Sequence, residues 1–269
     1  MPDVYTRVTE ADPEVLEGLM RALEIRAADP QQRAMLHTYL TDAALPQGAR
    51  VLEVGCGTGA VTRVLATWPG VGEAIGIDPS PVLLAKAREL ARGLTTLSFE
   101  QGDGRSLPFA GATFDAVVFH TTLCHVPEPD VMLGDAVRIL RPGGCLAVFE
   151  GDYATGTLAT GAGDPLDACA AAFREHFVHD PWLARRLPAL VRAAGVHVQC
   201  VRSHGYVEAP TPGFMLPSWV DLGADALAAA GRIGADMAAA LKAEARRRVA
   251  SGEYFGHIAY MSLVARTSA

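Results

Sequence analysis

A short apolar run that ends in three alternate glycines is the feature that most restricts the fold of this chain. The run covers residues 51–54, and Gly55, Gly57 and Gly59 follow in the stretch VLEVGCGTG. Glycine lets a backbone turn tightly and come close to a ligand, because it has no Cβ. One glycine would be enough for a turn from a strand into a helix. Three of them predict a loop that faces a ligand at the end of a buried strand.

Strands and helices continue to alternate up to residue 151. Strands are expected at 51–54, 73–78, 97–103, 114–120 and 145–151, with helices at about 58–67, 79–92 and 128–140 and a turn at 141–144. Apolar strands that alternate with helices of about ten to fifteen residues indicate parallel βαβ units with helices on both faces. The predicted fold class is therefore α/β.

The segments on either side of this core have a different pattern. Helical periodicity covers residues 12–44, so residues 1–45 are predicted as an N-terminal helical cap and 46–155 as the core. Residues 156–269 are predicted to complete the same domain. After a loop at 152–163, helices are expected at 164–178, 181–194, 214–229 and 232–250, with strands at 196–209 and 254–267. The helices at about 210–250 then form an insertion between the last two strands, placed to act as a lid.

Composition excludes several classes of function. The chain has 269 residues and a formal net charge of −7, which argues against nucleic acid as a partner, because binding phosphates needs a basic face. Its densest basic run, 246–248, is interpreted as a solvated helix face. The five cysteines are scattered, which predicts reduced thiols and no metal site. Neither a signal peptide nor an apolar run of about 18 residues is found, so a cytoplasmic protein without a membrane span is expected.

Acidic residues close three successive predicted strands. Glu53 lies beside the glycines, and a carboxylate there would attract a cationic group and repel a pyrophosphate. Asp78 ends the second strand, where a carboxylate can accept both hydroxyls of a ribose. Asp103 follows the third strand and could accept from the amine of adenine. Each acid alone could be a helix cap or a turn residue. Together they describe a ligand with an amino-acid head, a ribose and an adenine, which is S-adenosylmethionine.

Five motifs together resemble class I S-adenosylmethionine-dependent methyltransferases. They are VLEVGCGTG, GIDPS, GDGRSLPF, FDAVVFHTTLCHV and LRPGG, within residues 45–150. The chain is most similar to the ubiquinone/menaquinone-biosynthesis-like branch (methyltransferase type 11 domain) and its natural-product relatives. This resemblance implies a Rossmann-like sheet of seven strands with the last one antiparallel. The cofactor residues that it implies are Glu53, Gly55, Cys56, Gly57 and Gly59 for the methionine part, Asp78 and Pro79 for the ribose, Asp103 and Gly104 for the adenine, and His120 on the methionine side.

Two residues are candidates for catalysis. Some relatives that methylate hydroxyls on natural products resemble this chain at His125 and Asp152, where a histidine and an aspartate help to deprotonate the acceptor. Histidine suits this role because its pKa lies near neutrality. The alternative is that His125 packs the junction between a strand and a helix and that Asp152 caps a loop. Because of this histidine and aspartate pair, oxygen is slightly favoured over nitrogen or carbon as the methyl acceptor.

Aromatic residues outside the core are candidates for binding an apolar or aromatic acceptor. They are Tyr5, Phe177, Phe214 and Trp219. Phe177 could instead belong to the hydrophobic core, and Phe214 and Trp219 could form the lid.

Three other functions stay open. The fold could bind S-adenosylmethionine without transfer, or it could steer the cyclisation of a biosynthetic intermediate. A nicotinamide-dependent oxidoreductase is less favoured, because its GxGxxG fingerprint would need a glycine where Ala60 stands. Two features disfavour protein or nucleic-acid acceptors. The net charge of the chain is negative, and the stretch HTTL follows the fourth strand in place of an NPPY-type tetrapeptide.

Overall fold

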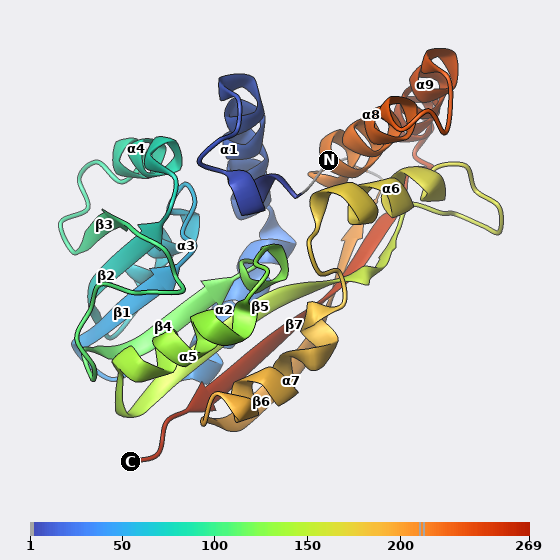
Figure 1. Cartoon of the computed structure of the whole chain (residues 1–269). Coiled ribbons are helices and arrows are strands. Elements are labelled where there is room, and N and C mark those ends of the chain that lie inside the picture. Colours follow the sequence, from blue (N-terminus) through green and yellow to red (C-terminus); the bar gives the residue numbers. More distant parts are fainter. Residues whose placement is uncertain (1–2, 210, 212) are drawn as a thin grey trace.

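One seven-stranded sheet organises the molecule (Figure 1). A computed structural model describes residues 3–209, 211 and 213–269. The strand order is β3-β2-β1-β4-β5-β7-β6. The strands are β1 (Ala49–Val54), β2 (Val71–Asp78), β3 (Leu97–Gln101), β4 (Phe114–His120), β5 (Leu140–Thr157), β6 (His197–Glu208) and β7 (Gly256–Arg266). The first five run parallel and β7 pairs antiparallel with both β5 and β6, so the predicted fold class and the antiparallel last strand are confirmed.

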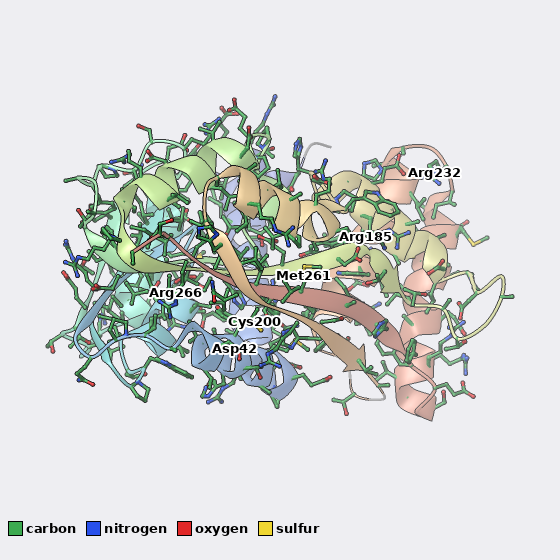
Figure 2. All side chains as sticks on the ribbon, turned by 90° about the horizontal axis from the view of Figure 1, so that it is seen from below. Asp42, Arg185, Cys200, Arg232, Met261 and Arg266 are labelled. Atoms are coloured by element: carbon green, nitrogen blue, oxygen red, sulfur yellow. The ribbon has the colours of Figure 1, made fainter. Side chains whose placement is uncertain are left out.

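Helices cover both faces of the sheet. The helices are α1 (Pro13–Ala28), α2 (Pro30–Ala43), α3 (Ala60–Leu65), α4 (Pro81–Leu90), α5 (Pro129–Ile139), α6 (Asp167–Phe177), α7 (Leu183–Ala193), α8 (Leu222–Ala229) and α9 (Ala235–Ser251). Short helical turns are η1 (Val4–Arg7), η2 (Leu123–His125) and η3 (Leu216–Asp221). Figure 2 shows α5 and α7 on one face and α2 on the other, where Asp42 of α2 bonds Arg202 of β6 at 2.5 Å.

The centre of the sheet is buried on both faces, as expected for parallel strands. In β1, Val51, Leu52 and Val54 are almost inaccessible, and β1 pairs with β2 and β4. One cluster of buried apolar side chains runs through all three predicted segments of the chain, from α2 to α9. The boundaries at residues 45 and 155 stay predictions.

β5 is longer than the predicted strand at 145–151. It includes the residues predicted as a turn (141–144) and reaches into the predicted loop at 152–163. The antiparallel partner explains the extension at the carboxyl-terminal end, because β7 pairs with β5 from Cys145 to Asp152 and again at Thr157, across an irregularity in register. Sequence patterns at a strand end do not reveal how far a partner strand continues.

The helices between β6 and β7 lie beyond the ends of β5 and β7, next to α6 (Figure 1). They are η3, α8 and α9, so the predicted helical segments are present with slightly different bounds. Whether they open and close as a lid stays a prediction. They place aromatic side chains over the carboxyl-terminal end of the parallel strands.

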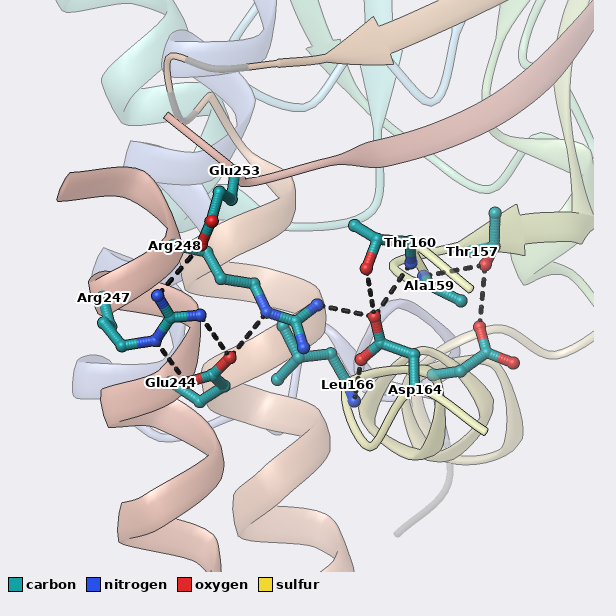
Figure 3. Close-up of polar contacts among 10 residues, drawn as sticks. Thr157, Ala159, Thr160, Asp164, Leu166, Glu244, Arg247, Arg248 and Glu253 are labelled. Atoms are coloured by element: carbon teal, nitrogen blue, oxygen red, sulfur yellow. Dashed lines mark hydrogen bonds and ion pairs between the residues drawn. The ribbon is translucent and has the colours of Figure 1, made fainter. Parts of the chain in front are cut away.

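Arg248 of α9 forms an ion pair with Asp164, which lies in the segment before α6 (Figure 3). Its guanidinium donates to Asp164 Oδ2 at 2.6 Å and to Glu244 Oε1 at 2.8 Å, and only 10% of its side chain is exposed. The interpretation of 246–248 as a solvated face is therefore wrong for Arg248. Burial alone would raise the pKa of Asp164, but hydrogen bonds from Arg248, Thr160 and Leu166 outweigh it and hold that pKa below its usual range.

Replacing Arg248 with methionine should lower the free energy of unfolding by about 3 kcal/mol, because Asp164 is left buried without its cation. Urea denaturation followed by circular dichroism measures the change. Since the pKa of Asp164 is depressed in the fold, this contribution is present above about pH 4 and disappears as the pH falls further. Arg247→Met is the matched control at the exposed neighbouring position and should cost less than about 1 kcal/mol. Equal losses for the two variants would contradict the role of the buried pair.

Candidate functional site

A large cavity lies at the carboxyl-terminal end of the parallel strands. Its volume is about 1360 Å³. Side chains from η1, α1, the turn after β1, the ends of β2 and β4, α6 and η3 line it. The predicted site residues in this lining are Tyr5, Glu53, Gly55, Cys56, Gly57, Asp78, Pro79, Asp103, Gly104, His120, His125, Phe177, Phe214 and Trp219. The structure thus brings the predicted cofactor, acceptor and catalytic residues to one cavity, with the exceptions of Gly59 and Asp152.

The glycines after β1 meet two different requirements. Gly55 has a φ of 74°, and a Cβ there would lie 2.3 Å from Thr122 Cγ2, so the turn and the end of β4 can approach only without a side chain. Gly59 has a φ of 72° and stands before the first residue of α3. A Cβ on Gly59 would meet the Phe99 ring at 2.5 Å. Gly59 therefore packs against β3, which corrects its prediction as a ligand-facing residue.

Glu53 is a buried acid that has no ion-pair partner among the described residues. It is 3% exposed, and Thr62 Oγ1 donates a short hydrogen bond to its Oε2. Burial raises the pKa of Glu53 to about 8, although the hydrogen bond from Thr62 opposes this rise. A carboxylate in this position would be stabilised by a positively charged group in the cavity. The site thus fits the amino group of a bound amino-acid moiety.

Asp78 joins the glycine turn to the start of α4. Its Oδ2 accepts from the Gly57 amide and its Oδ1 from the Ser80 amide, each at 2.9 Å. Burial raises the pKa of this carboxyl, and the two amides partly offset the rise. Both oxygens retain a lone pair for further donors. A ribose with two adjacent hydroxyls is the kind of ligand that could supply them.

Asp103 lies at the exposed rim of the cavity. Arg105 donates to its carboxylate at 2.7 Å and also to Glu128 at 3.0 Å, and the bond from Arg105 holds the pKa of Asp103 below its usual value. Gly104 beside it leaves room for Met132, because a Cβ there would lie 2.2 Å from Met132 Cε. The predicted contact of Asp103 with adenine would therefore compete with Arg105.

His120 and Cys56 are neutral parts of the wall. The Tyr39 hydroxyl lies 3.0 Å from His120 Nδ1, and the imidazole stacks on Phe149 at 4.7 Å. Burial, and secondarily Arg26, lowers the pKa of His120 well below its usual value. Burial also raises the pKa of the Cys56 thiol. Neither side chain then adds charge beside Glu53.

His125 pairs with Asp3, a residue that sequence reasoning missed. Its Nδ1 lies 2.6 Å from Asp3 Oδ2, which also accepts from the His179 amide at 2.8 Å. The Tyr5 ring packs on the imidazole at 4.3 Å. Among the described residues, Nε2 of His125 has no hydrogen-bond partner. This arrangement fixes the ring and leaves Nε2 able to accept a proton from a ligand in the cavity.

Asp152, predicted as the second catalytic residue, is turned away from the cavity. Its Oδ2 accepts from Arg185 of α7 at 2.8 Å. Successive side chains of a strand point to opposite faces, so Tyr153 lines the cavity while Asp152 points to the helix on the other side. The prediction that Asp152 shares the catalytic role is corrected for this reason.

Stacked aromatic rings form the far end of the cavity. Trp219 of η3 stacks on Phe173 of α6 at 5.2 Å and on Tyr153 of β5 at 6.2 Å. Phe177 stacks on Phe173, and Phe214 packs on Tyr206. Trp219 and Phe214 are almost fully buried, so they belong to the core and to the cavity wall at once. Their roles in acceptor binding stay predictions.

Arg26 of α1 is the second residue that sequence reasoning missed. Leu19, Leu23 and Arg26 follow the i, i+4, i+7 spacing, so an arginine continues the apolar side of α1. That spacing could have indicated from the sequence that Arg26 faces the interior of the protein. The side chain lines the cavity, and its Nη1 donates to Thr121 Oγ1 at 2.8 Å.

The part of the chain that the structure describes contains neither a membrane-spanning helix nor a cluster of metal-ligating side chains. None of its helices has the length and apolar character to cross a membrane. Within the same residues, no group of three or more His, Cys, Asp or Glu side chains could hold a metal ion.

Comparison with known proteins identifies the central segment. Residues 52–148 match the family model described as "Methyltransferase domain". An uncharacterized methyltransferase of Schizosaccharomyces pombe is 39% identical over 38% of this chain and 40% of that protein. The 2-phytyl-1,4-naphtoquinone methyltransferase of Thermosynechococcus vestitus is 36% identical over 39% of this chain and 48% of that protein. The chain thus spans half or less of the length of the curated relatives it matches.

Solved structures extend the similarity to most of the fold. A putative methyltransferase from Bacillus halodurans C-125 covers 87% of this chain and 99% of its own, with a TM-score of 0.63 and 18% identity. The [4+2]-cyclase SpnF covers 88% of this chain and 82% of its own, with a TM-score of 0.57 and 26% identity. Residues 52–148 are therefore similar to methyltransferase domains, and the chain has the fold of the S-adenosylmethionine-dependent methyltransferases.

Proposed function

We propose that this protein transfers a methyl group from S-adenosylmethionine to a small-molecule acceptor, with oxygen as the favoured acceptor atom. The observation that carries the proposal is the single cavity that contains Glu53, Asp78 and Asp103 at one end and stacked aromatic rings at the other. A cofactor and an acceptor can occupy such a cavity together. Enclosure by side chains of η1, α1 and η3 would exclude water from the reaction.

The residues that would hold the cofactor are those that end the parallel strands. Glu53 would bind the amino group, and Asp78 would accept from the ribose hydroxyls. The Gly55–Gly57 turn would let the backbone lie against the methionine part, with Cys56 and His120 as neutral walls. When bound, the cofactor supplies an electrophilic methyl group on a positively charged sulfur.

The chain's own contribution to transfer is alignment and proton removal. Holding the acceptor in line with the methyl group supplies most of the acceleration available to such a reaction. His125 would take the proton of an acceptor hydroxyl at Nε2, while Asp3 holds Nδ1 and stabilises the protonated ring. Asp3 is thus a positioning residue, and it takes the place predicted for Asp152.

The similarity to a [4+2]-cyclase favours a second candidate. That structure has 26% identity with this chain, and the cyclase shares the fold over most of its length. An aromatic-walled cavity would also suit an apolar intermediate that folds on itself. In that case the bound cofactor would support the cavity without being consumed. A gain in mass of one methyl group in the product separates the two candidates.

Calorimetry and a product assay test the proposal together. The wild-type protein is titrated with S-adenosylmethionine, S-adenosylhomocysteine and NAD, and is then incubated with phenols, amines and polyketides. We expect both sulfur compounds to bind, NAD not to bind, and a methylated product to appear in mass spectrometry. Binding of NAD alone would contradict the proposal. Binding of the cofactor with a rearranged, unmethylated product would establish the cyclase instead.

Glu53→Gln should weaken the binding of S-adenosylhomocysteine by more than about ten-fold, because it removes the partner of the ammonium group. The raised pKa of about 8 adds a dependence on pH. Below that pH the carboxyl is mostly protonated and must lose its proton on binding, so wild-type affinity should rise from about pH 6.5 to 8 and then level off. Calorimetry over this range measures both effects.

Two further results complete this test. The rise in affinity with pH should be absent in Glu53→Gln. Glu73→Gln, at an exposed position of β2 paired with Arg50, should behave as wild type. A normal pH profile in Glu53→Gln would show that another group binds the cofactor's amino group.

His125→Ala should lower turnover by about a hundred-fold or more, since a positioned general base contributes roughly that much. Asp3→Asn should reduce turnover less, and both variants should bind S-adenosylhomocysteine as wild type does. Single-turnover rates with the acceptor identified in the product assay measure these effects. Asp152→Asn is the matched control and should keep full turnover. Loss of turnover in Asp152→Asn with an active His125→Ala would reverse the assignment.

A further inference from the structure

Arg26 carries a positive charge at the cavity without a negative partner among the described residues. Its Nη1 donates to Thr121 Oγ1 at 2.8 Å and its Nε to Gln32 Oε1 at 3.4 Å, but the buried Nη2 has no acceptor in the same part of the chain. Acids on and near α1 have other partners, since Glu24 pairs with Arg63, Asp3 with His125, and Asp29 accepts from the amides at the start of α2. An arginine side chain stays protonated in proteins, so this charge cannot be removed by a change in pKa.

The rings around Arg26 do not supply the missing charge. Its guanidinium lies over the Tyr260 ring at 5.4 Å. Burial raises the pKa of the Tyr5, Tyr153 and Tyr260 hydroxyls, so these groups are neutral. Cation–π contacts stabilise a guanidinium but leave its N–H groups without acceptors.

A second buried donor beside Arg26 is also without an acceptor. Gln32, the first-turn residue of α2 whose Oε1 faces Arg26, is 3% exposed and lines the cavity. Its Nε2 approaches the Tyr260 hydroxyl but does not reach hydrogen-bonding geometry with any described residue. Buried donors without acceptors cost about 1–3 kcal/mol each, more when charged. Two neighbouring donors in this state indicate a place for the oxygens of a ligand.

The backbone at this place is held in an unfavourable conformation. Thr121, which receives the Arg26 hydrogen bond, has a φ of 53°, and a β-branched residue rarely adopts a left-handed backbone. Its hydroxyl also donates to the His120 carbonyl at 2.7 Å. Such conformations cost about 1–3 kcal/mol and persist where the surroundings fix them, often at binding sites.

Arg26 lies between the predicted cofactor residues and the aromatic wall. Glu53 lies on β1, and the neighbouring strand β4 ends at His120, directly before Thr121. Arg26 donates to Thr121 and lies over the ring of Tyr260 on β7, which pairs with β5. β5 carries Tyr153, which stacks on Trp219 in the aromatic wall.

We propose that Arg26 and Gln32 bind a carboxylate of the acceptor, so that the acceptor is an organic acid with an apolar, aromatic-sized body. The inference rests on the proposed function, because it assigns the second ligand of the same cavity. A carboxylate matches the planar fork of a guanidinium and accepts several hydrogen bonds at once. The aromatic rings would hold the body of the acceptor, and its acid group would fix its orientation.

Calorimetry with a matched pair of probes tests this assignment. The protein is saturated with S-adenosylhomocysteine and titrated with naphthoate and with its uncharged amide, naphthamide. Wild type should bind naphthoate at least about ten-fold more tightly than naphthamide. Arg26→Met should remove that preference by weakening naphthoate alone, and Gln32→Leu should reduce it. Arg92→Met, at an exposed position in the turn after α4, is the control and should keep the preference.

Two outcomes would overturn the proposal. A wild-type protein that binds both probes equally, or neither, has no carboxylate subsite. An Arg26→Met protein that loses S-adenosylhomocysteine would show that the guanidinium holds the cofactor's own carboxylate. The proposed function fails separately, if wild type does not bind S-adenosylhomocysteine at all. Thermal unfolding of each variant confirms that it is folded before titration.

Discussion

The site depends on the Asp78 carboxylate, which binds the backbone of two different turns. One oxygen holds the Gly57 amide after β1, and the other holds the Ser80 amide before α4. These bonds fix two neighbouring strand ends relative to each other and keep the glycine turn in a left-handed conformation that glycine alone adopts easily. Together with the bonds from the Gly55 and Cys56 amides to the Ile77 carbonyl, this link fixes the shape of the loop that faces the cavity.

Two ionisable side chains without a partner of opposite charge then characterise the cavity. Among the described residues, no cation pairs with Glu53 near the glycine turn, and no anion pairs with Arg26 beside the ends of β4 and β7. The same residues show no ion pair between Glu53 and Arg26. Burying such groups unpaired is costly, so their persistence indicates ligands that complete them. A cationic amino group at one end and an acid group at the other would do so.

That the residues of the proposed cofactor half share one cavity could be predicted from the sequence, because they lie close together in the chain. Residues 51–104 contain three strand ends, and parallel strands bring their carboxyl ends to one edge whatever the details of packing. Glu53, Asp78 and Asp103 therefore reach one cavity as predicted. Gly59 and Asp152 were misjudged for reasons of orientation, since the face to which a side chain points depends on strand register and on the packing of Phe99 and Arg185. Asp3 could not be inferred, because its partner His125 lies 122 residues away.

The proposed acceptor half of the cavity is assembled from segments far apart in the chain. Tyr5 and Arg26 come from its first helical elements, Tyr153 from the extension of β5, and Trp219 from the helices before β7. No short motif records such an arrangement, because each residue is placed by tertiary packing alone. The same separation explains how one cofactor-binding core can serve different acceptors, since the flanking helices can change without disturbing the Asp78 link. Specificity in this protein would then be set by the helices above the sheet, and the chemistry by the strand ends below them.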